Sequence, residues 1–337
     1  MRCKGSDYRT IMQTTVKKTL NVLLPLALGA AILWWMYKEF DFRQMADTLH
    51  HGMNWGWMAF SLVFGILAQV FRGLRWRQTL DPLGEHPRRS TCIHAVFISY
   101  AASLLIPRIG EVTRCGVLNR YEGTSFSKAI GTVITERIID SLLLLTVIVI
   151  VAFSQLSVLN DFFQHTGTDF TDLLHRFTTM GYVVTFVCLL VTAVFLWFLL
   201  RRFRISTNLR KMLADIKAGI LSLRNVKNKA LFTFYTLAIW ISYFLLFYIT
   251  FYSFPFTQYL GLHVGIVTFS VCSIASVAPT PNGMGPFHFA VKTMLVLYGV
   301  AATSAETFVL IVHAVQTALI PLLAVYSLIC LSLRKRA

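Results

Sequence analysis

Residues 103–140 read SLLIPRIGEVTRCGVLNRYEGTSFSKAIGTVITERIID, and the rest of the chain is organised around them. This stretch ends one apolar run, breaks at Pro107, and then enters a second apolar run near Ala129. Six of the charged side chains in this stretch lie either directly after the break or inside the second apolar run: Arg108, Glu111, Arg114, Glu136, Arg137 and Asp140. A charge at membrane depth costs about 2.5–3.5 kcal/mol on insertion scales, so we expect these side chains to face protein rather than lipid.

The composition is typical of a polytopic helical membrane protein. The 337 residues are 56% hydrophobic, and the mean hydropathy is +0.63. Several apolar runs are close to twenty residues long, and the alternating pattern of a transmembrane barrel is absent from the sequence. Because only helices and closed barrels satisfy their backbone groups in lipid, we predict an all-α membrane helical bundle in a single domain, residues 1–337.

The apolar runs predict where the helices lie. We expect membrane spans at 20–37, 55–71, 129–153, 182–200, 231–252 and 306–333. Two further elements are expected to be interrupted, at 91–114 and 262–300. The segment 207–224 spaces its apolar residues as an amphipathic helix does, and it lies either on the inner membrane surface or in solvent as a connection.

The distribution of positive charge predicts the orientation. The formal net charge is +16, and most of the 31 Lys and Arg residues lie between apolar runs. If the short run 91–106 returns to its own side, the inner segments hold 26 of these residues and the outer loops hold 3. This agrees with the positive-inside rule and predicts a re-entrant 91–114 and cytoplasmic termini in a bacterial inner membrane. We expect the charge to contact anionic phospholipids rather than nucleic acid.

Neither a disulfide framework, nor a metal site, nor a cofactor is expected. The six cysteines are scattered, mostly inside apolar runs, and none has the close spacing of metal ligands. We expect reduced thiols that pack as small hydrophobic groups. The basic N-terminal region before 20–37 resembles a signal peptide, but no small-residue cleavage site follows, so we predict an uncleaved first span.

A second interruption, PTPNGMGP at residues 279–286, lies in the later half of the chain. The residues that mark it are Pro279, Pro281, Asn282, Gly283, Gly285 and His288. Prolines and glycines at this density do not remain helical, and such backbone at membrane depth must be buried in protein or line a cavity. Paired interruptions are typical of transporters with a central site, with an inverted repeat as a further hypothesis. A tight hairpin outside the membrane is the alternative.

The charged residues of the first interruption have two interpretations. Glu136 and Asp140 are four residues apart and share one helix face. An internal salt-bridge network that joins helices would explain the charges, because structural ion pairs are as common as functional ones. Alternatively, they form a polar path for a lipid headgroup, in which Arg72 and Arg75 also meet the phosphate through their guanidinium groups.

The motifs PRIGEVTR and TERIID, with the earlier RGLRW and the late PTPNGMGPFH, resemble the flippase-like transmembrane family named after lysylphosphatidylglycerol synthase. The resemblance covers nearly the whole chain and implies the membrane region of enzymes that aminoacylate phosphatidylglycerol and move the product between leaflets. Its motif residues correspond here to Pro107, Arg108, Gly110, Glu111, Arg114, Glu136, Arg137 and Asp140. The two-part enzymes carry a soluble aminoacyl transferase domain after the last span, whereas this sequence stops at Ala337, so we do not expect that activity. Asn282 stands where we expect glycine in many relatives.

Three functions are consistent with these features. The first is an inner-membrane lipid translocase, a flippase or scramblase-like protein that moves an anionic or zwitterionic phospholipid or lipid-linked headgroup through a polar cleft. The second is a membrane-embedded transferase, although the sequence shows no catalytic nucleophile, metal-ligand cluster or nucleotide motif. The third is a non-transporting partner of a separate lipid-modifying enzyme. Whether the chain forms a homo-oligomer is left open.

Overall fold

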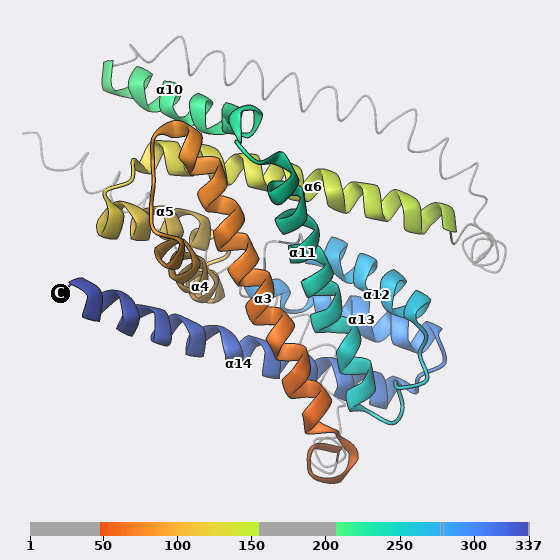
Figure 1. Cartoon of the computed structure of the whole chain (residues 1–337). Helices are drawn as coiled ribbons and strands as arrows, with labels where there is room; N and C mark the ends of the chain where they lie inside the picture. Colours follow the sequence, from red (N-terminus) through yellow and green to blue (C-terminus); the bar gives the residue numbers. More distant parts are fainter. Residues whose placement is uncertain (1–47, 155–206, 277, 279, 336–337) are drawn as a thin grey trace, which may run out of the picture.

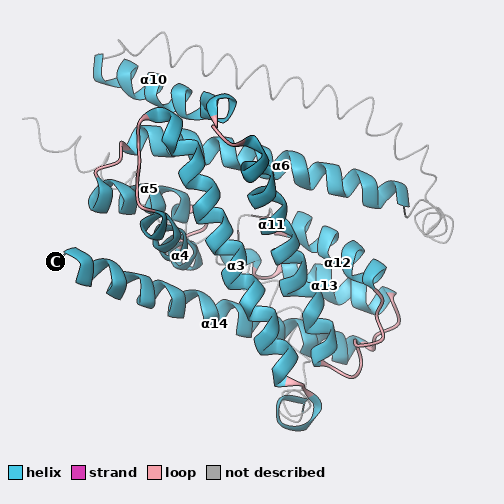
Figure 2. Ribbon diagram, in the orientation of Figure 1, coloured by secondary structure: helices cyan, strands magenta, loops and turns pink. Residues whose placement is uncertain are grey.

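The computed structural model describes residues 48–154, 207–276, 278 and 280–335. These residues form helices joined by short connections, and no strand occurs among them (Figure 2). The predicted all-α bundle is therefore confirmed for this part of the chain. The spans predicted at 20–37 and 182–200, and most of the loops beside them, lie outside the described residues.

The first described segment contains the first predicted interruption. After a π-helical turn, its helices are α3 (Trp55–Leu80), α4 (Arg89–Leu105), α5 (Ile109–Glu122) and α6 (Phe126–Ser154). Helix α3 begins at Asn54, whose side chain accepts hydrogen bonds from the backbone N–H groups of Gly56 and Trp57. Helix α5 ends at Gly123, which has a left-handed conformation that glycine adopts at little cost.

The later segments contain the second predicted interruption. Their helices are α10 (Thr207–Leu221), α11 (Lys229–Tyr248), α12 (Leu262–Ala275), α13 (Pro286–Leu297) and α14 (Ala302–Lys335). Helix α11 continues into the 3-10 turn Ile249–Ser253, and Pro281–Gly283 forms a 3-10 turn between α12 and α13. Both predicted breaks are therefore present, at 106–108 and 276–285. Their re-entrant depth in a membrane stays a prediction.

Helix α3 runs through the middle of the molecule, between α11 on one side and the α4–α5 hairpin on the other (Figure 1). Glycines permit the closest helix contacts. A Cβ atom at Gly73 of α3 would lie 2.8 Å from the Cα of Ile93 on α4. A Cβ at Gly131 of α6 would lie 2.4 Å from the carbonyl oxygen of Ile216 on α10. The α3–α4 and α6–α10 pairs thus pack backbone against backbone.

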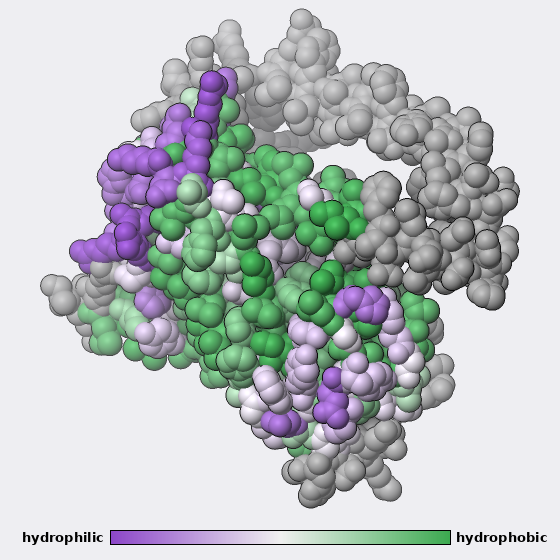
Figure 3. Space-filling model, turned by 45° about the vertical axis from the view of Figure 1, so that its right-hand side comes forward, coloured by the Kyte–Doolittle hydropathy of each residue, from purple (hydrophilic) through white to green (hydrophobic). Residues whose placement is uncertain are grey.

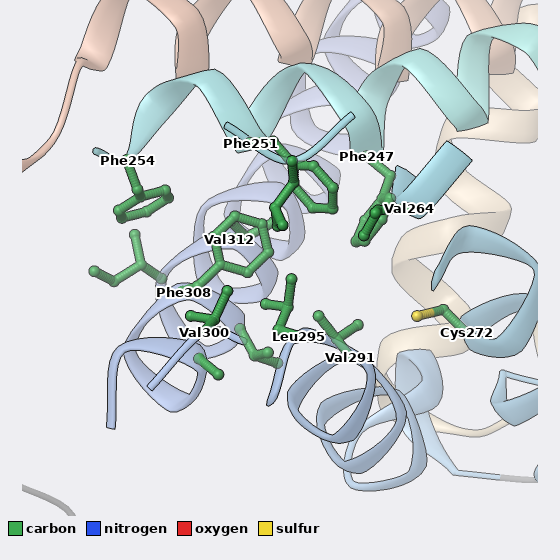
Figure 4. Packing of buried hydrophobic residues seen from close by; sticks show 14 of the residues in the cluster. Phe247, Phe251, Phe254, Val264, Cys272, Val291, Leu295, Val300, Phe308 and Val312 are labelled. Carbon is green, nitrogen blue, oxygen red and sulfur yellow. The ribbon is translucent and has the colours of Figure 1, made fainter. Parts of the chain in front are cut away.

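The largest hydrophobic cluster joins α11 and its 3-10 extension to α12, α13 and α14 (Figure 4). Phe308 of α14 packs against Phe251 of the extension and Phe254, the residue after it, with ring centroids 5.6 Å and 5.2 Å away. Edge-to-face rings at these separations contribute about 0.5–1.5 kcal/mol per pair beyond burial of their area. This cluster holds the second interruption against the rest of the bundle.

The chain is an integral membrane protein by its surface as well as its sequence. In the described part, three helical stretches are long and apolar enough to span a bilayer: Trp55–Leu83, Lys229–Ser253 and Ala302–Leu333. Figure 3 shows a broad hydrophobic surface between hydrophilic side chains at opposite ends of the displayed face. Large apolar side chains on these helices, such as Phe234, Leu322 and Leu333, are exposed, as expected for contact with lipid.

Two predicted boundaries differ from the structure. The span predicted to end at residue 71 continues to Leu80, so Arg72 and Arg75 lie inside α3 rather than in an inner loop. They remain helical because carboxylates on another helix pair with them. The helix predicted at 207–224 is α10 with the 3-10 turn Ser222–Asn225. It packs along α6.

Candidate functional site

A cavity of about 490 Å³ lies between the two interrupted elements. The first element contributes residues from Pro107 to Arg114, and the second contributes residues from Ala278 to Phe287. Helices α3, α4, α6, α11, α12 and α14 provide the remaining wall. Two segments that are about 170 positions apart in the sequence therefore face one space, because α4–α5 and α12–α13 both fold back on themselves.

The first interruption is a tight turn that aims charged residues at this cavity. Arg108 has a φ angle of 65°, a left-handed conformation that L-residues with a side chain rarely adopt. After it, α5 packs so closely on α4 that a Cβ at Gly110 would lie 2.1 Å from the Ser99 carbonyl oxygen. The Gly110 N–H also donates to the Ser103 hydroxyl over 3.2 Å. The hairpin thus fixes where α5 begins.

Buried ion pairs join α3, α5 and α6 behind the cavity. Arg72 Nη1 lies 3.0 Å from Asp140 Oδ2, and Arg75 Nη2 lies 2.9 Å from Asp140 Oδ1. Arg75 Nε lies 3.7 Å from Glu136 Oε1, and Arg114 Nη1 lies 2.8 Å from Glu136 Oε2. The side chains of Arg75 and Glu136 are both 0% exposed. Glu136 is therefore shared by arginines of α3 and α5, whereas Asp140 pairs with two arginines of α3.

A second, more open pair lies at the edge of this network. Arg137 Nε lies 3.4 Å from Glu111 Oε1, and Arg137 Nη2 lies 3.5 Å from Asp140 Oδ2. The side chains of Arg137 and Glu111 are 42% and 41% exposed. Because solvent screens exposed pairs, this contact contributes little to stability and its groups are accessible from the cavity.

Aromatic rings support the arginines. The Arg114 guanidinium carbon lies 4.7 Å from the centre of the Trp76 ring, and the Trp76 indole N–H donates to the Thr132 hydroxyl over 2.9 Å. The Arg72 guanidinium carbon lies 5.8 Å from the Tyr243 ring centre. A guanidinium group over an aromatic face is held by the ring quadrupole and keeps a fixed plane.

The site as a whole carries more positive than negative charge. The network and the first interruption together contain five arginines and three carboxylates, which gives a net formal charge of +2. Of the described residues that line the cavity itself, Arg72, Arg108, Arg114 and Arg137 are cationic and Glu111 is anionic, which gives +3.

The second interruption is held in place by α14. Asn282 has a φ angle of 51°, and its side-chain Nδ2 donates to the Thr317 hydroxyl over 2.8 Å. His313 Nε2 lies 3.2 Å from the Asn282 carbonyl oxygen, and the rings of His288 and His313 have centroids 4.5 Å apart. His288 is buried beside the break and does not line the cavity.

The structure places the predicted site residues in three groups. Those that line the cavity are Arg72, Arg108, Glu111, Arg114, Arg137, Asn282 and Gly283. Those behind it or beside it are Arg75, Glu136, Asp140, Gly285 and His288. Pro281 contributes backbone to the 3-10 turn, and Pro279 lies outside the described residues.

Sequence reasoning missed the neutral polar and aromatic wall. Ser99, Tyr100 and Ser103 of α4 line the cavity, as do Trp240 and Tyr243 of α11. The hydroxyl oxygens of Tyr100 and Tyr243 are 2.6 Å apart. Serines four apart and aromatics three apart each mark one face of an apolar helix, and this spacing is the signal that could have found them. The other such residues are Phe269, Ser273, Ser276, Thr280 and Gln316.

Among the described residues, no three His, Cys, Asp or Glu side chains gather as a metal site requires. Cys92, Cys115 and Cys272 are buried free thiols, and Cys330 is half-buried. The donors at the cavity are instead guanidinium, hydroxyl, amide and indole groups. Such groups bind oxyanions and hydroxyl groups rather than metal ions.

Comparison with known proteins gives a family match over most of the chain. The model described as lysylphosphatidylglycerol synthase TM region matches residues 22–324. The matched range includes both interrupted elements and every described residue that lines the cavity. Neither a curated protein nor a solved structure matches the chain.

Proposed function

The chain belongs to the lysylphosphatidylglycerol synthase transmembrane-region family, whose members are membrane proteins linked to lipid metabolism or translocation, and we propose that it is a lipid translocase. In this proposal it moves the headgroup of an anionic or zwitterionic phospholipid, or of a lipid-linked compound, between the leaflets of a bacterial inner membrane. The acyl chains stay in the bilayer while the headgroup occupies the cavity.

One observation carries the proposal: both interrupted elements line one cavity, and four arginines line it with them. Irregular backbone at membrane depth is tolerated where it borders a polar cavity, and paired broken helices surround the substrate site in transporters. A cavity of about 490 Å³ is within the range of small-ligand sites and large enough for a headgroup without its chains.

The arginines and carboxylates have separate roles in this proposal. Arg72 and Arg114 present planar guanidinium groups that fit phosphate oxygens. Glu136 and Asp140 lie behind them, with relative exposures of 0% and 8%, and position the guanidinium groups through ion pairs. The carboxylates thereby lower the cost of keeping arginine charge inside the bilayer.

Reconstitution tests the function directly. Purified protein in liposomes, with a fluorescent phospholipid in one leaflet, should accelerate loss of the label from that leaflet relative to protein-free liposomes. Arg224→Ala is a matched control for arginine variants at the cavity, because Arg224 is exposed on the 3-10 turn after α10 and does not line the cavity.

The same experiment distinguishes the other two functions. A transferase would produce a new lipid species in extracts from the liposomes after a donor is added. A non-transporting partner would leave both the leaflet distribution and the lipid composition unchanged. If the distribution is unchanged across several headgroups and ion gradients, the translocase proposal fails.

A further inference from the structure

The cavity has a surplus of positive charge, and this surplus carries an inference about the headgroup. Resting on the proposed function, we propose that the cavity selects a net-anionic headgroup, with one phosphate diester and an uncharged, hydroxyl-bearing remainder. Because of the same surplus of positive charge, the cavity discriminates against a headgroup with net positive charge. The family description names a lysyl-bearing lipid, whose net charge is positive, and this lipid therefore provides the contrasting headgroup for the test.

The carboxylates near the cavity are already occupied. Asp140 is within 3.5 Å of Arg72, Arg75 and Arg137, and Glu136 contacts both Arg75 and Arg114. Glu111 is the one carboxylate among the described lining residues, and it pairs with Arg137. An incoming ammonium group would therefore have to displace an arginine to find a counter-ion.

The arginines, in contrast, keep unused donors. In the described part of the chain, Arg72 Nε and Arg114 Nη2 are buried and have no hydrogen-bond acceptor. Both side chains line the cavity, with relative exposures of 5% and 2%. A buried charged donor without an acceptor is costly, because the group has lost its hydration. A phosphate oxyanion in the cavity would supply the missing acceptors and charge.

The wall formed by α11, α12 and the second interruption is polar but uncharged. Trp240 Nε1 and Thr280 Oγ1 are buried and have no hydrogen-bond partner in the described structure. Ser273 and Ser276 lie on the same wall, and Gln316 of α14 also lines the cavity. These hydroxyl, amide and indole groups suit the hydroxyl oxygens of a polyol.

The aromatic rings of the cavity do not reverse the preference for an anionic over a cationic headgroup. Tyr243 could in principle hold an ammonium group on its face, but the Arg72 guanidinium carbon already lies 5.8 Å from its ring centre. A second cation would meet that charge inside a cavity whose lining carries +3. Like charges brought together at a desolvated site strongly oppose binding.

Two measurements on the full chain test the proposal. In proteoliposomes, leaflet-labelled phosphatidylglycerol, phosphatidylcholine and lysyl-phosphatidylglycerol with identical acyl chains are compared. We expect phosphatidylglycerol to move at least about tenfold faster than lysyl-phosphatidylglycerol. In detergent, thermal unfolding is measured with short-chain forms of the same lipids and with inorganic phosphate. We expect short-chain phosphatidylglycerol to raise the unfolding temperature most, and stabilisation by phosphate alone would assign the site to a free anion.

A charge series strengthens the test without altering the buried network. Arg108→Gln lowers the lining charge from +3 to +2, and Arg108→Glu lowers it to +1. In detergent, the ratio of stabilisation by short-chain phosphatidylglycerol to stabilisation by short-chain lysyl-phosphatidylglycerol should fall in that order, whereas Arg224→Glu, outside the cavity, should leave it unchanged. Because Arg108 is exposed, these variants are expected to fold.

The outcomes separate the two proposals. Equal transport of all three lipids would overturn the selectivity and leave the translocase function standing. Absence of transport with selective stabilisation by phosphatidylglycerol would overturn the translocase function and support the selectivity of the site. Faster movement or stronger stabilisation by the cationic lipid would overturn the inference.

Discussion

Arg108 and Asn282 lie in different interrupted elements, both have positive φ angles, 65° and 51°, and both line the same cavity. Among the described residues they are the two non-glycine positions with this conformation. A left-handed conformation costs a residue with a Cβ about 1–2 kcal/mol. Strained backbone of this kind clusters at functional sites, where the surrounding structure keeps it in place.

Replacing Arg108 should separate stability from transport. Arg108→Gly removes both the left-handed strain and the guanidinium group, so its unfolding free energy should equal or exceed that of the unchanged protein while lipid transport is lost. Arg108→Ala keeps the strain and loses the charge, and should transport as poorly. Detergent unfolding and liposome transport measure the two effects. Normal transport by both folded variants would mean that Arg108 does not contact the substrate.

Glu111→Ala tests the exposed pair at the cavity edge. Glu111 and Arg137 are each about 40% exposed, so removing the carboxylate should change stability by less than about 1 kcal/mol. We expect transport to be abolished, because Arg137 loses one of its two carboxylate partners and with it its position at the edge of the cavity. Equal expression and unfolding temperature are the controls. A folded Glu111→Ala variant with unchanged transport would reduce this pair to a structural contact.

Replacing Arg75 should affect folding rather than transport alone. Arg75 is wholly buried, contacts both Glu136 and Asp140, and does not line the cavity. Removing one partner of a buried ion pair costs about 3–5 kcal/mol, so Arg75→Ala should unfold at much lower temperature or denaturant concentration. Arg224→Ala, at an exposed site, should unfold as the unchanged protein does. If the two variants unfold alike, the buried pairs contribute little.

The contact between α6 and α10 depends on two facing glycines. A Cβ at Gly131 would lie 2.4 Å from Ile216 O, and one at Gly219 would lie 2.6 Å from the Gly131 Cα. Gly131→Ala should therefore cost about 1–3 kcal/mol of unfolding free energy through overpacking. Gly116→Ala is the matched control, because a Cβ there meets nothing within 4 Å and should stabilise its helix by about 0.5–1 kcal/mol.

Asn282 provides a test of the second turn. At a φ angle of 51°, glycine should be tolerated, while alanine adds strain and removes the hydrogen bond to the Thr317 hydroxyl. We expect Asn282→Ala to lower the unfolding free energy by about 1–2 kcal/mol relative to Asn282→Gly. Denaturant unfolding in one detergent compares them. Equal stability of the two variants would show that this backbone conformation is not maintained.

Most of the described helices and both breaks could be predicted from the sequence, because apolar runs indicate helices, and clustered proline and glycine indicate breaks. The residue at which α3 ends could not be predicted from the sequence. Arg72 and Arg75 look like a loop in the linear chain, since the carboxylates that stabilise them lie more than 60 positions away on α6.

The neutral wall was missed for a related reason. Trp240 and Tyr243 stand in a run of apolar residues and carry no charge, so nothing local distinguishes them from residues that pack in a core. Only the fold of α11 beside the two interruptions gives them a cavity to line. Charged residues could be predicted as a site, whereas their neutral neighbours needed the tertiary structure.

The ion pairs of Arg75 restrict how α3 and α6 can move relative to each other. It bridges two successive turns of α6 from the middle of α3, so sliding either helix past the other would break both ion pairs at once. We therefore expect α3 and α6 to stay fixed relative to each other. If the chain translocates lipid as proposed, we expect the movement that opens the cavity to either side of the bilayer to occur in other elements, such as the α4–α5 hairpin with its turn at residues 106–108.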